Sequence, residues 1–221
     1  MRTKLSLLRN ETEITTRALN ALEYFHHLLS DDAAVNIINE NIYFWKQYEK
    51  AIITQIFIGI RRLFENQKDT FNFQTFINYC KTNIDEFSYA SFEKRRLPDN
   101  IVRPKYLDDY MTHIYIPKEE DFNNLARVVR DNSKRIHGFY LNISSKIYAH
   151  AALTDFQEIN TALRQVQIHE IEAGLSALWH VYEQIWNLYE NGQEPSFSIS
   201  CPYKFKSEVQ RSLYKQIFGT A

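Results

Sequence analysis

The sequence is poor in the residues that turn or break a chain. It has 5 glycines and 5 prolines among 221 residues, and three of the prolines fall between residues 98 and 117. Glycine and proline punctuate turns, so this scarcity argues against an all-β fold and favours long helices. Cysteine is also scarce. Cys80 and Cys201 are too few for a disulfide-rich scaffold, and no Cys-x-x-Cys pair is present for zinc or redox chemistry.

Long apolar runs and a charge of one sign are missing as well. The longest apolar segment, Ala51–Ile60, is too short to span a membrane, and the N-terminus lacks an apolar run of signal-peptide length. We therefore expect a cytoplasmic protein with no membrane segment. The formal net charge is −1, so the chain can attract RNA only through a local basic patch.

Several catalytic motifs are absent. The chain has no GxxxxGK[ST], GxGxxG, HExxH or GxSxG motif, which argues against a P-loop nucleotidase, a zinc protease or an α/β-hydrolase. Asp108, Asp109 and His113 are residue types that suit a divalent ion. The sequence shows no second half of such a site, so we expect neither a metal nor a cofactor.

The residues that are present predict an all-α fold. Hydrophobic residues make up 44% of the chain, and 15 Phe and 14 Tyr can fill the space between helices. We expect one domain over residues 1–221, an antiparallel, up-and-down bundle with long central helices and short flanking helices. An irregular loop is expected at 97–118, with one helical turn at Tyr106–Met111, and a C-terminal tail from about residue 193.

Apolar spacing and caps place the individual helices. The first is expected to begin at Asn10, which with Glu13 fits a capping box, and to bury Ile14, Ala18, Leu22, Phe25 and Leu29. The other expected helices span Asp32–Asn66, Asn72–Lys81, Ile84–Arg95, Glu119–His150, Ala162–Asn191 and Glu208–Phe218. Gly192 stands where a helix commonly ends in a left-handed residue.

The helix expected at Glu119–His150 carries the candidate chemistry. Its apolar residues, Phe122, Leu125, Val129, Ile136, Phe139, Ile143 and Ile147, follow one helical stripe. Its other faces collect cations and imidazoles: Arg127, Arg130, Lys134, Arg135, His137, Lys146 and His150. Groups of this kind along one helix suit a phosphate ester, and the rest of the chain is expected to pack around this helix. Spacing alone is weak support, because about one Arg–His match of this length is expected by chance.

Two sequence phrases resemble a known family. They are NIYFWKQYEKAIITQIFIGIRRLFEN at 41–66 and NISSKIYAHAALTD at 142–155. With a long helix carrying a basic residue and a downstream histidine, they resemble the HEPN superfamily (higher eukaryotes and prokaryotes nucleotide-binding), and more closely its abortive-infection branch. The likeness covers roughly Ile37 to Tyr189.

The resemblance implies a metal-independent ribonuclease that works as a dimer, with an Arg followed by a His after four to six residues. Arg130–Asp131 with His137 fits that signature literally. His150 fits better by position, but Ser144 and Ser145 stand where its Arg is expected, and Lys146 is the nearest cation. Both pairs therefore stay candidates for catalysis, and the candidate RNA-binding residues are Lys134, Arg135, Arg127 and Tyr148.

Two functions remain open at this point. The first is a bacterial toxin–antitoxin or phage-defence protein that cleaves RNA, with His as general base and Arg or Lys on the phosphate. The second is a non-catalytic helical bundle that binds a partner protein. The expected partners are RNA, a second copy of the chain, and a cognate antitoxin or other defence protein. Clustered cations and imidazoles favour the enzyme, whereas near-neutral charge and the imperfect motif favour the binding protein.

Overall fold

The computed structural model describes residues 1–64, 70–97, 102–149, 168–199 and 205–219; the side chains of residue 135 and of 137–149 are not described. Every regular element within these ranges is helical and none is a strand, so the prediction of an all-α fold is confirmed. The α-helices are α1 (Arg2–Leu28), α2 (Asp32–Glu40), α3 (Ile42–Phe64), α4 (Phe73–Thr82), α5 (Tyr89–Arg96), α6 (Lys105–Thr112), α7 (Glu119–Ala149), α9 (Ile168–Trp186) and α10 (Lys206–Phe218). A 3-10 turn, η1 (Ile84–Phe87), and a π-helical turn, η2 (Asn187–Asn191), complete the set.

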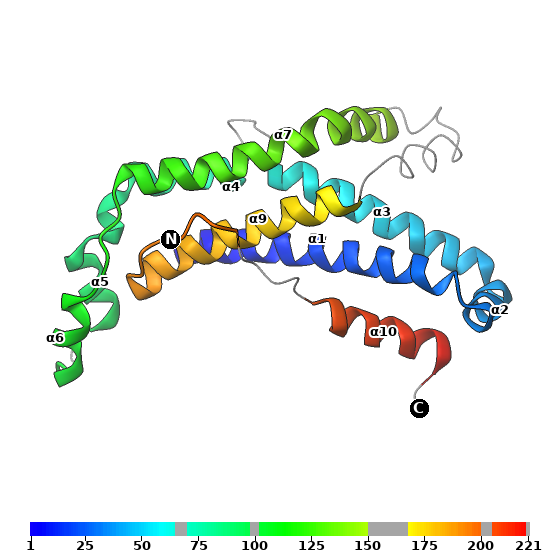
Figure 1. The fold of residues 1–221 in the computed structure, drawn as a ribbon, viewed down its shortest axis with the longest axis horizontal. Coiled ribbons are helices and arrows are strands. Elements are labelled where there is room, and N and C mark those ends of the chain that lie inside the picture. Colours follow the sequence, from blue (N-terminus) through cyan, green and yellow to red (C-terminus); the bar gives the residue numbers. More distant parts are fainter. Residues whose placement is uncertain (65–69, 98–101, 150–167, 200–204, 220–221) are drawn as a thin grey trace.

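The long helices form a bundle whose neighbours run in opposite directions (Figure 1). Helix α1 packs along α3 and α9, and α7 packs on α9, α4 and α3. Helices α5 and α6 extend from one end of this bundle, and α10 lies on the side of α1 away from α7, so the molecule has the outline of an arch. Within the described residues, no helix combines the length and the apolar character needed to cross a membrane.

Helix α1 starts well before the expected position, and the prediction of a capping box at Asn10 is wrong. Leu5 and Leu8 are 0% and 2% exposed, so the apolar stripe already begins in the first turns. Asn10 is an exposed residue inside the helix. The expected face was partly wrong as well, because Ile14 and Leu29 are 39% and 45% exposed.

Close contact between α1 and α3 depends on a glycine. A Cβ added at Gly59 of α3 would lie 2.0 Å from Oγ1 of Thr15 in α1. The Thr15 hydroxyl is turned into its own helix, where it donates to the carbonyl of Glu11 at 2.7 Å. The two helices can therefore approach at this point only because one of them has no side chain.

Two expected helices are interrupted. The region 32–66 contains two helices, because Asn41 leaves the helical conformation at φ −139° and ψ 55°. The region 84–95 is divided at Ser88, whose extended backbone and side-chain bond to the Ser91 amide begin α5. A local cap also begins α4, where the side chain of Asn72 accepts from the Thr75 amide in a capping box.

Candidate functional site

Helix α7 is held firmly at its N-terminal end. The carboxylate of Asp121 accepts from the Tyr115 hydroxyl at 2.9 Å and from the Lys118 amide at 2.8 Å. These bonds join the chain before α7 to its first turn, where the helix dipole favours negative charge. Burial, with this bond to Asp121, raises the pKa of Tyr115 to about 12, so its hydroxyl stays protonated as the donor.

The inward face of α7 follows the predicted stripe as far as Ile136; the side chains of the later stripe residues, Phe139, Ile143 and Ile147, are not described. Phe122, Leu125, Val129 and Ile136 are each less than 5% exposed. Facing them, α9 carries Gly174, where an added Cβ would lie 2.2 Å from Cδ1 of Ile136. Because α9 is this close, α7 cannot rotate without breaking the contact, and its polar residues are directed outward.

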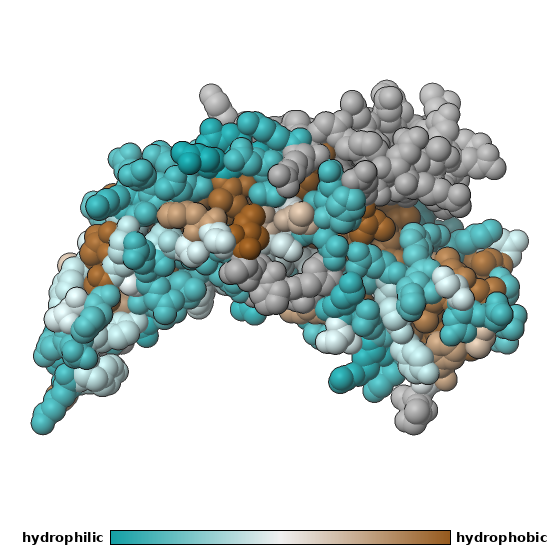
Figure 2. Space-filling view, viewed as in Figure 1, coloured by the Kyte–Doolittle hydropathy of each residue, from teal (hydrophilic) through white to brown (hydrophobic). Residues whose placement is uncertain are grey.

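The outward face carries a row of cations, Arg127, Arg130 and Lys134, which we call the cationic row. All three are exposed. Lys134 lies 3.9 Å from a carboxylate oxygen of Asp131, a long surface contact of little energetic weight. The described part of the chain gives neither Arg127 nor Arg130 a hydrogen-bond or ion-pair partner. Figure 2 shows hydrophilic residues over the outer side of the N-terminal half of α7.

Charge changes sign along α7. Its first turn carries Glu119 and Glu120, both exposed, whereas the cations follow from Arg127 onward. An anion would therefore be repelled at the start of the helix and attracted about two turns later. From Arg130 to position 137 the helix advances two turns, a rise of about 10 Å. The cationic row thus leads toward the part of α7 that includes His137.

The side chains of most of the predicted catalytic residues are not described by the structure. His150 is not among the described residues. Positions 135, 137, 146 and 148 belong to α7, but the side chains of Arg135, His137, Lys146 and Tyr148 are not described. The described structure therefore brings together Arg127, Arg130 and Lys134 on one surface, and the choice between His137 and His150 stays a prediction.

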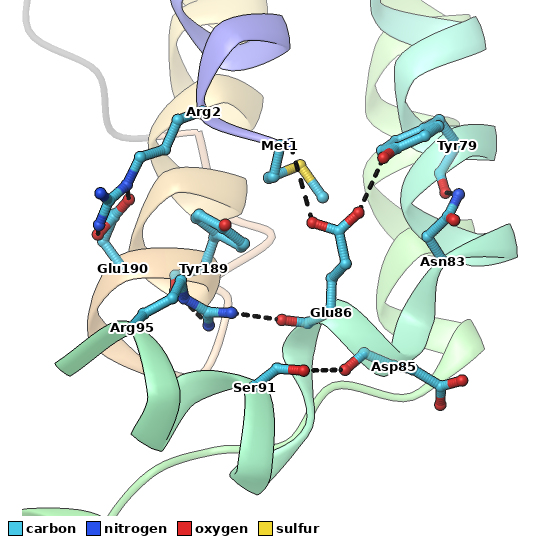
Figure 3. Close-up of polar contacts among 10 residues, drawn as sticks. All are labelled: Met1, Arg2, Tyr79, Asn83, Asp85, Glu86, Ser91, Arg95, Tyr189 and Glu190. Atoms are coloured by element: carbon cyan, nitrogen blue, oxygen red, sulfur yellow. Dashed lines mark hydrogen bonds and ion pairs between the residues drawn. The ribbon is translucent and has the colours of Figure 1, made fainter. Parts of the chain in front are cut away.

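A second polar cluster, which the sequence analysis did not find, lies where α1, η1, α5 and η2 meet (Figure 3). The Glu86 carboxylate accepts from the Tyr79 hydroxyl at 2.8 Å and lies 3.8 Å from the Met1 amine. Arg2 donates two bonds to the Glu190 carboxylate, at 2.6 and 2.9 Å. These bonds to Arg2 lower the pKa of Glu190.

The same cluster closes the end of the α9–η2 helix. The last carbonyls of a helix have no partner within it and must find one elsewhere. Here four consecutive carbonyls accept from donors in the segment 95–115: Tyr189 O from Arg95, Glu190 O from Arg96, Asn191 O from Tyr110, and Gly192 O from the Tyr115 amide. The described arginines and glutamates of this cluster each have a partner, which indicates a structural joint for α5 and α6 and not a ligand-binding site.

The structure confirms the predicted role of Gly192 at the end of a helix. Gly192 has φ 57° and ψ 33°, a left-handed conformation, and ends the helix as predicted. An added Cβ would lie 2.8 Å from Cβ of Ile114, so the turn is also crowded by the segment before α7. Glycine is therefore required here both for the backbone conformation and for the approach of this segment.

Comparison of nearly the whole sequence with protein-family models shows the family of the chain. A protein-family model for HEPN AbiU2 matches residues 2–215. The chain belongs to the HEPN AbiU2 family. The resemblance to the abortive-infection HEPN branch is thereby confirmed, and the match extends beyond the Ile37–Tyr189 region in both directions. Comparison with curated proteins and with solved structures finds no match.

In this AbiU2-family chain the three candidate metal ligands, Asp108, Asp109 and His113, do not form a cluster. Arg103 donates to the Asp108 carboxylate at 2.8 Å. Nδ1 of His113 lies 2.8 Å from the backbone carbonyl of Asp109, within the end of α6. Within the described ranges, no three His, Cys, Asp or Glu side chains come together as a metal site. The segment 97–118, expected to be mostly irregular, contains the two-turn helix α6 because Leu107 and Met111 pack on Phe92 of α5.

Proposed function

We propose that this protein acts in abortive-infection phage defence as a metal-independent endoribonuclease, and that the outer face of α7 binds the RNA backbone. Membership of the AbiU2 family supports the defence role. The exposed cationic row supports the RNA-binding role, and it is the single observation that carries the proposal. A toxin–antitoxin arrangement, in which a cognate antitoxin restrains the nuclease, fits the same role.

The exposed row is suited to phosphates because its two arginines are not neutralised by the described residues around them. A guanidinium presents several N–H donors in a fixed plane and can bind a phosphate through two bonds. Elsewhere in the described structure, arginines such as Arg2, Arg95 and Arg103 are bound to carboxylates or carbonyls. Arg127 and Arg130 therefore differ from these structural arginines in being available to an external anion.

The proposed chemistry needs a base and a cation. A neutral histidine, His150 or His137, removes the proton from a ribose 2′-hydroxyl. The 2′-oxygen then bonds to the adjacent phosphorus while the bond to the 5′-oxygen of the next nucleotide breaks, and that 5′-oxygen takes a proton from the protonated histidine or from water. Lys146 or Arg130 stabilises the charge that develops on the phosphate oxygens. No step in this sequence requires a metal ion.

Single-residue variants distinguish the two candidate histidines. The purified protein is incubated with RNA in buffer that contains a chelator, beside His150→Ala and His137→Ala. Loss of the general base lowers cleavage by roughly 100- to 10,000-fold, so one variant should lose nearly all activity while the other keeps it. We expect His150 to be the base, because its position matches the family better. Cleavage that disappears with chelator alone would refute the metal-free mechanism.

A binding protein without catalysis is the second candidate function. Ser144 and Ser145 stand where the family arginine is expected, and this departure is the specific observation in its favour. A wild-type protein that cuts no RNA, with and without chelator, but that co-purifies with a partner protein would support this alternative. RNA binding through the cationic row without cleavage would also fit an inactive member of the family.

A further inference from the structure

A second candidate site lies on the other side of the molecule from the cationic row. Helix α10 packs on α1 and α2 and leaves a pocket of about 570 Å³ between itself and the first turns of α3. Figure 1 shows α10 and α7 on opposite sides of α1. The pocket is lined by Arg17, Ala18, Ala21, Phe44, Trp45, Tyr48, Val209, Ser212, Leu213 and Gln216. Its volume falls in the range of small-molecule sites, roughly 300 to 1,000 Å³.

Three aromatic rings of α3 form one wall of this pocket. The Trp45 ring stands at 82° to Phe44 and at 83° to Tyr48. Phe44 and Tyr48 are nearly parallel, with an interplanar angle of 16°. Trp45 is held from behind by Phe25, which stacks on it at 5.7 Å between centroids, so the wall is supported by the core. The other side, on α1, carries the small residues Ala18 and Ala21, which leave room for a ligand.

The charged groups beside the pocket are paired with one another. Arg17 donates to Glu13 at 2.9 Å and lies 3.0 Å from Glu208, and its guanidinium also lies over the Phe205 ring at 4.3 Å. With two carboxylates bound to it, Arg17 offers little to an anion. Both carboxylates are bound to Arg17 and neither lines the pocket, so neither is an unpaired partner for a cation there. The pocket therefore suits an uncharged ligand.

Neutral polar groups complete the lining. Tyr48 supplies a hydroxyl, and burial raises its pKa, so the hydroxyl remains a neutral donor. Ser212 and Gln216 on α10 supply a second hydroxyl and an amide, and both residues are exposed. Within the described ranges, none of these three side chains has a hydrogen-bond partner. A ligand could therefore stack on the aromatic wall and bond through its polar edge.

We propose that this pocket binds an uncharged, planar heteroaromatic molecule, with Phe44 and Tyr48 as the stacking surface, Trp45 supporting them from the core, and Ser212 and Gln216 as its polar contacts. The comparison of two adjacent exposed residues of α3, Tyr43 and Phe44, indicates that the ligand is small. Tyr43 is 82% exposed on α3 but does not line the pocket, whereas Phe44, the next residue, is 55% exposed and does. The aromatic surface that faces the pocket is thus limited to the three rings of the wall.

Calorimetric titration with neutral and charged probes tests the proposal. Indole and adenine are the neutral bicyclic probes, and tetramethylammonium and benzoate are the charged controls. We expect saturable one-to-one binding of at least one neutral probe and none of the charged ones. Phe44→Ala should weaken that binding about ten-fold, and Ser212→Phe, which fills the pocket from an exposed position, should abolish it. Tyr43→Ala is the matched control and should leave binding unchanged.

Several results would overturn the proposal. One is the absence of binding by both neutral probes below about 1 mM in a protein that melts normally. Equal effects of Phe44→Ala and Tyr43→Ala would show that the wall is not the binding surface. Tighter binding of a charged probe would assign the pocket to another ligand class. Sedimentation of the same variants tests whether a second copy of the chain occupies the pocket. If no probe binds and Phe44→Ala loses a dimer that the wild type forms, the pocket is assigned to a second copy.

Discussion

The guanidinium of Arg95 donates to the backbone carbonyl of Tyr189 at 2.8 Å and lies over the ring of the same residue, 4.0 Å from its centroid. It also donates to the Glu86 carbonyl at 2.6 Å. One side chain thereby joins α5 to the end of η2 and to η1. Burial lowers the pKa of Arg95, but an arginine remains charged at neutral pH, so the joint is a charge-assisted one.

Replacing Arg95 by alanine should loosen α5 and α6. Two part-buried carbonyls lose their donor, at roughly 1 to 2 kcal/mol each, the lower part of the range for buried groups, so we expect the free energy of unfolding to fall by about 2 to 4 kcal/mol. Urea denaturation measures the fall, and hydrogen exchange should show faster exchange in α5 and α6. Lys94→Ala, an exposed neighbour, is the control and should change stability by less than about 0.5 kcal/mol. Equal effects of the two variants would contradict the assignment.

Gly59→Ala should destabilise the contact between α1 and α3. In an isolated helix this change stabilises by about 1 kcal/mol. Here the new Cβ would lie 2.0 Å from Thr15 Oγ1, so we expect a net loss of about 1 to 3 kcal/mol in thermal or urea unfolding. Adding Thr15→Ala removes the hydroxyl and methyl that the new Cβ meets, and should recover part of the loss. An unchanged or raised stability in Gly59→Ala alone would show that the helices are not this close.

Stability should depend on Glu190 in acid. The bonds to Arg2 lower the folded-state pKa of Glu190, so its contribution is present above the ordinary glutamate pKa of about 4.3 and is lost as the pH falls through the lower folded value. The stability difference between wild type and Glu190→Gln should therefore shrink below about pH 4.3. Urea midpoints from pH 7 to pH 3 measure it. Glu120→Gln, at an exposed position, is the control, and a difference that stays constant with pH would contradict the pairing.

Removing the two arginines of the cationic row should weaken RNA binding in a salt-dependent way. Each phosphate contact to a single strand contributes about 0.7 to the slope of log affinity against log salt. The double variant Arg127→Ala, Arg130→Ala should lower that slope by about 1.4, measured by fluorescence anisotropy. Arg211→Ala with Lys215→Ala, two exposed cations on α10, is the matched control. A slope lowered equally by both pairs would indicate non-specific attraction and not a site on α7.

We expect the protein to form a homodimer, because the family to which it belongs suggests a site built from two copies. In such a dimer the outer faces of two α7 helices would border one shared basic cleft. Sedimentation at concentrations from about 1 to 100 μM should show a dimer, and cross-linking between cysteines placed at Arg127 should report the approach of the two helices. Monomer alone over this range would count against a composite site.

Where a helix is encoded locally, the sequence was sufficient to predict it. The cap at Asn72 lies directly before the buried residues of α4, and the left-handed Gly192 lies directly after η2. The stripe of α7 was also read correctly as far as Ile136, because burial at a spacing of three and four residues is a property of one helix. Caps and periodicity act over one or two turns, so neighbouring residues carry the whole signal. The same reasoning placed the cationic row on an outer face.

Tertiary structure alone decided the contacts between distant segments. Asn10 has a capping sequence but lies inside α1, because burial of Leu5 and Leu8 against other helices extends that helix to Arg2. Arg95 and Tyr189 are 94 residues apart, and the residues around either one do not predict this contact. The aromatic pocket likewise exists because α10 packs on α1 and α2 and leaves the first turns of α3 uncovered. Such pairings depend on which helices pack together, which is set by the fit of whole surfaces and not by local spacing.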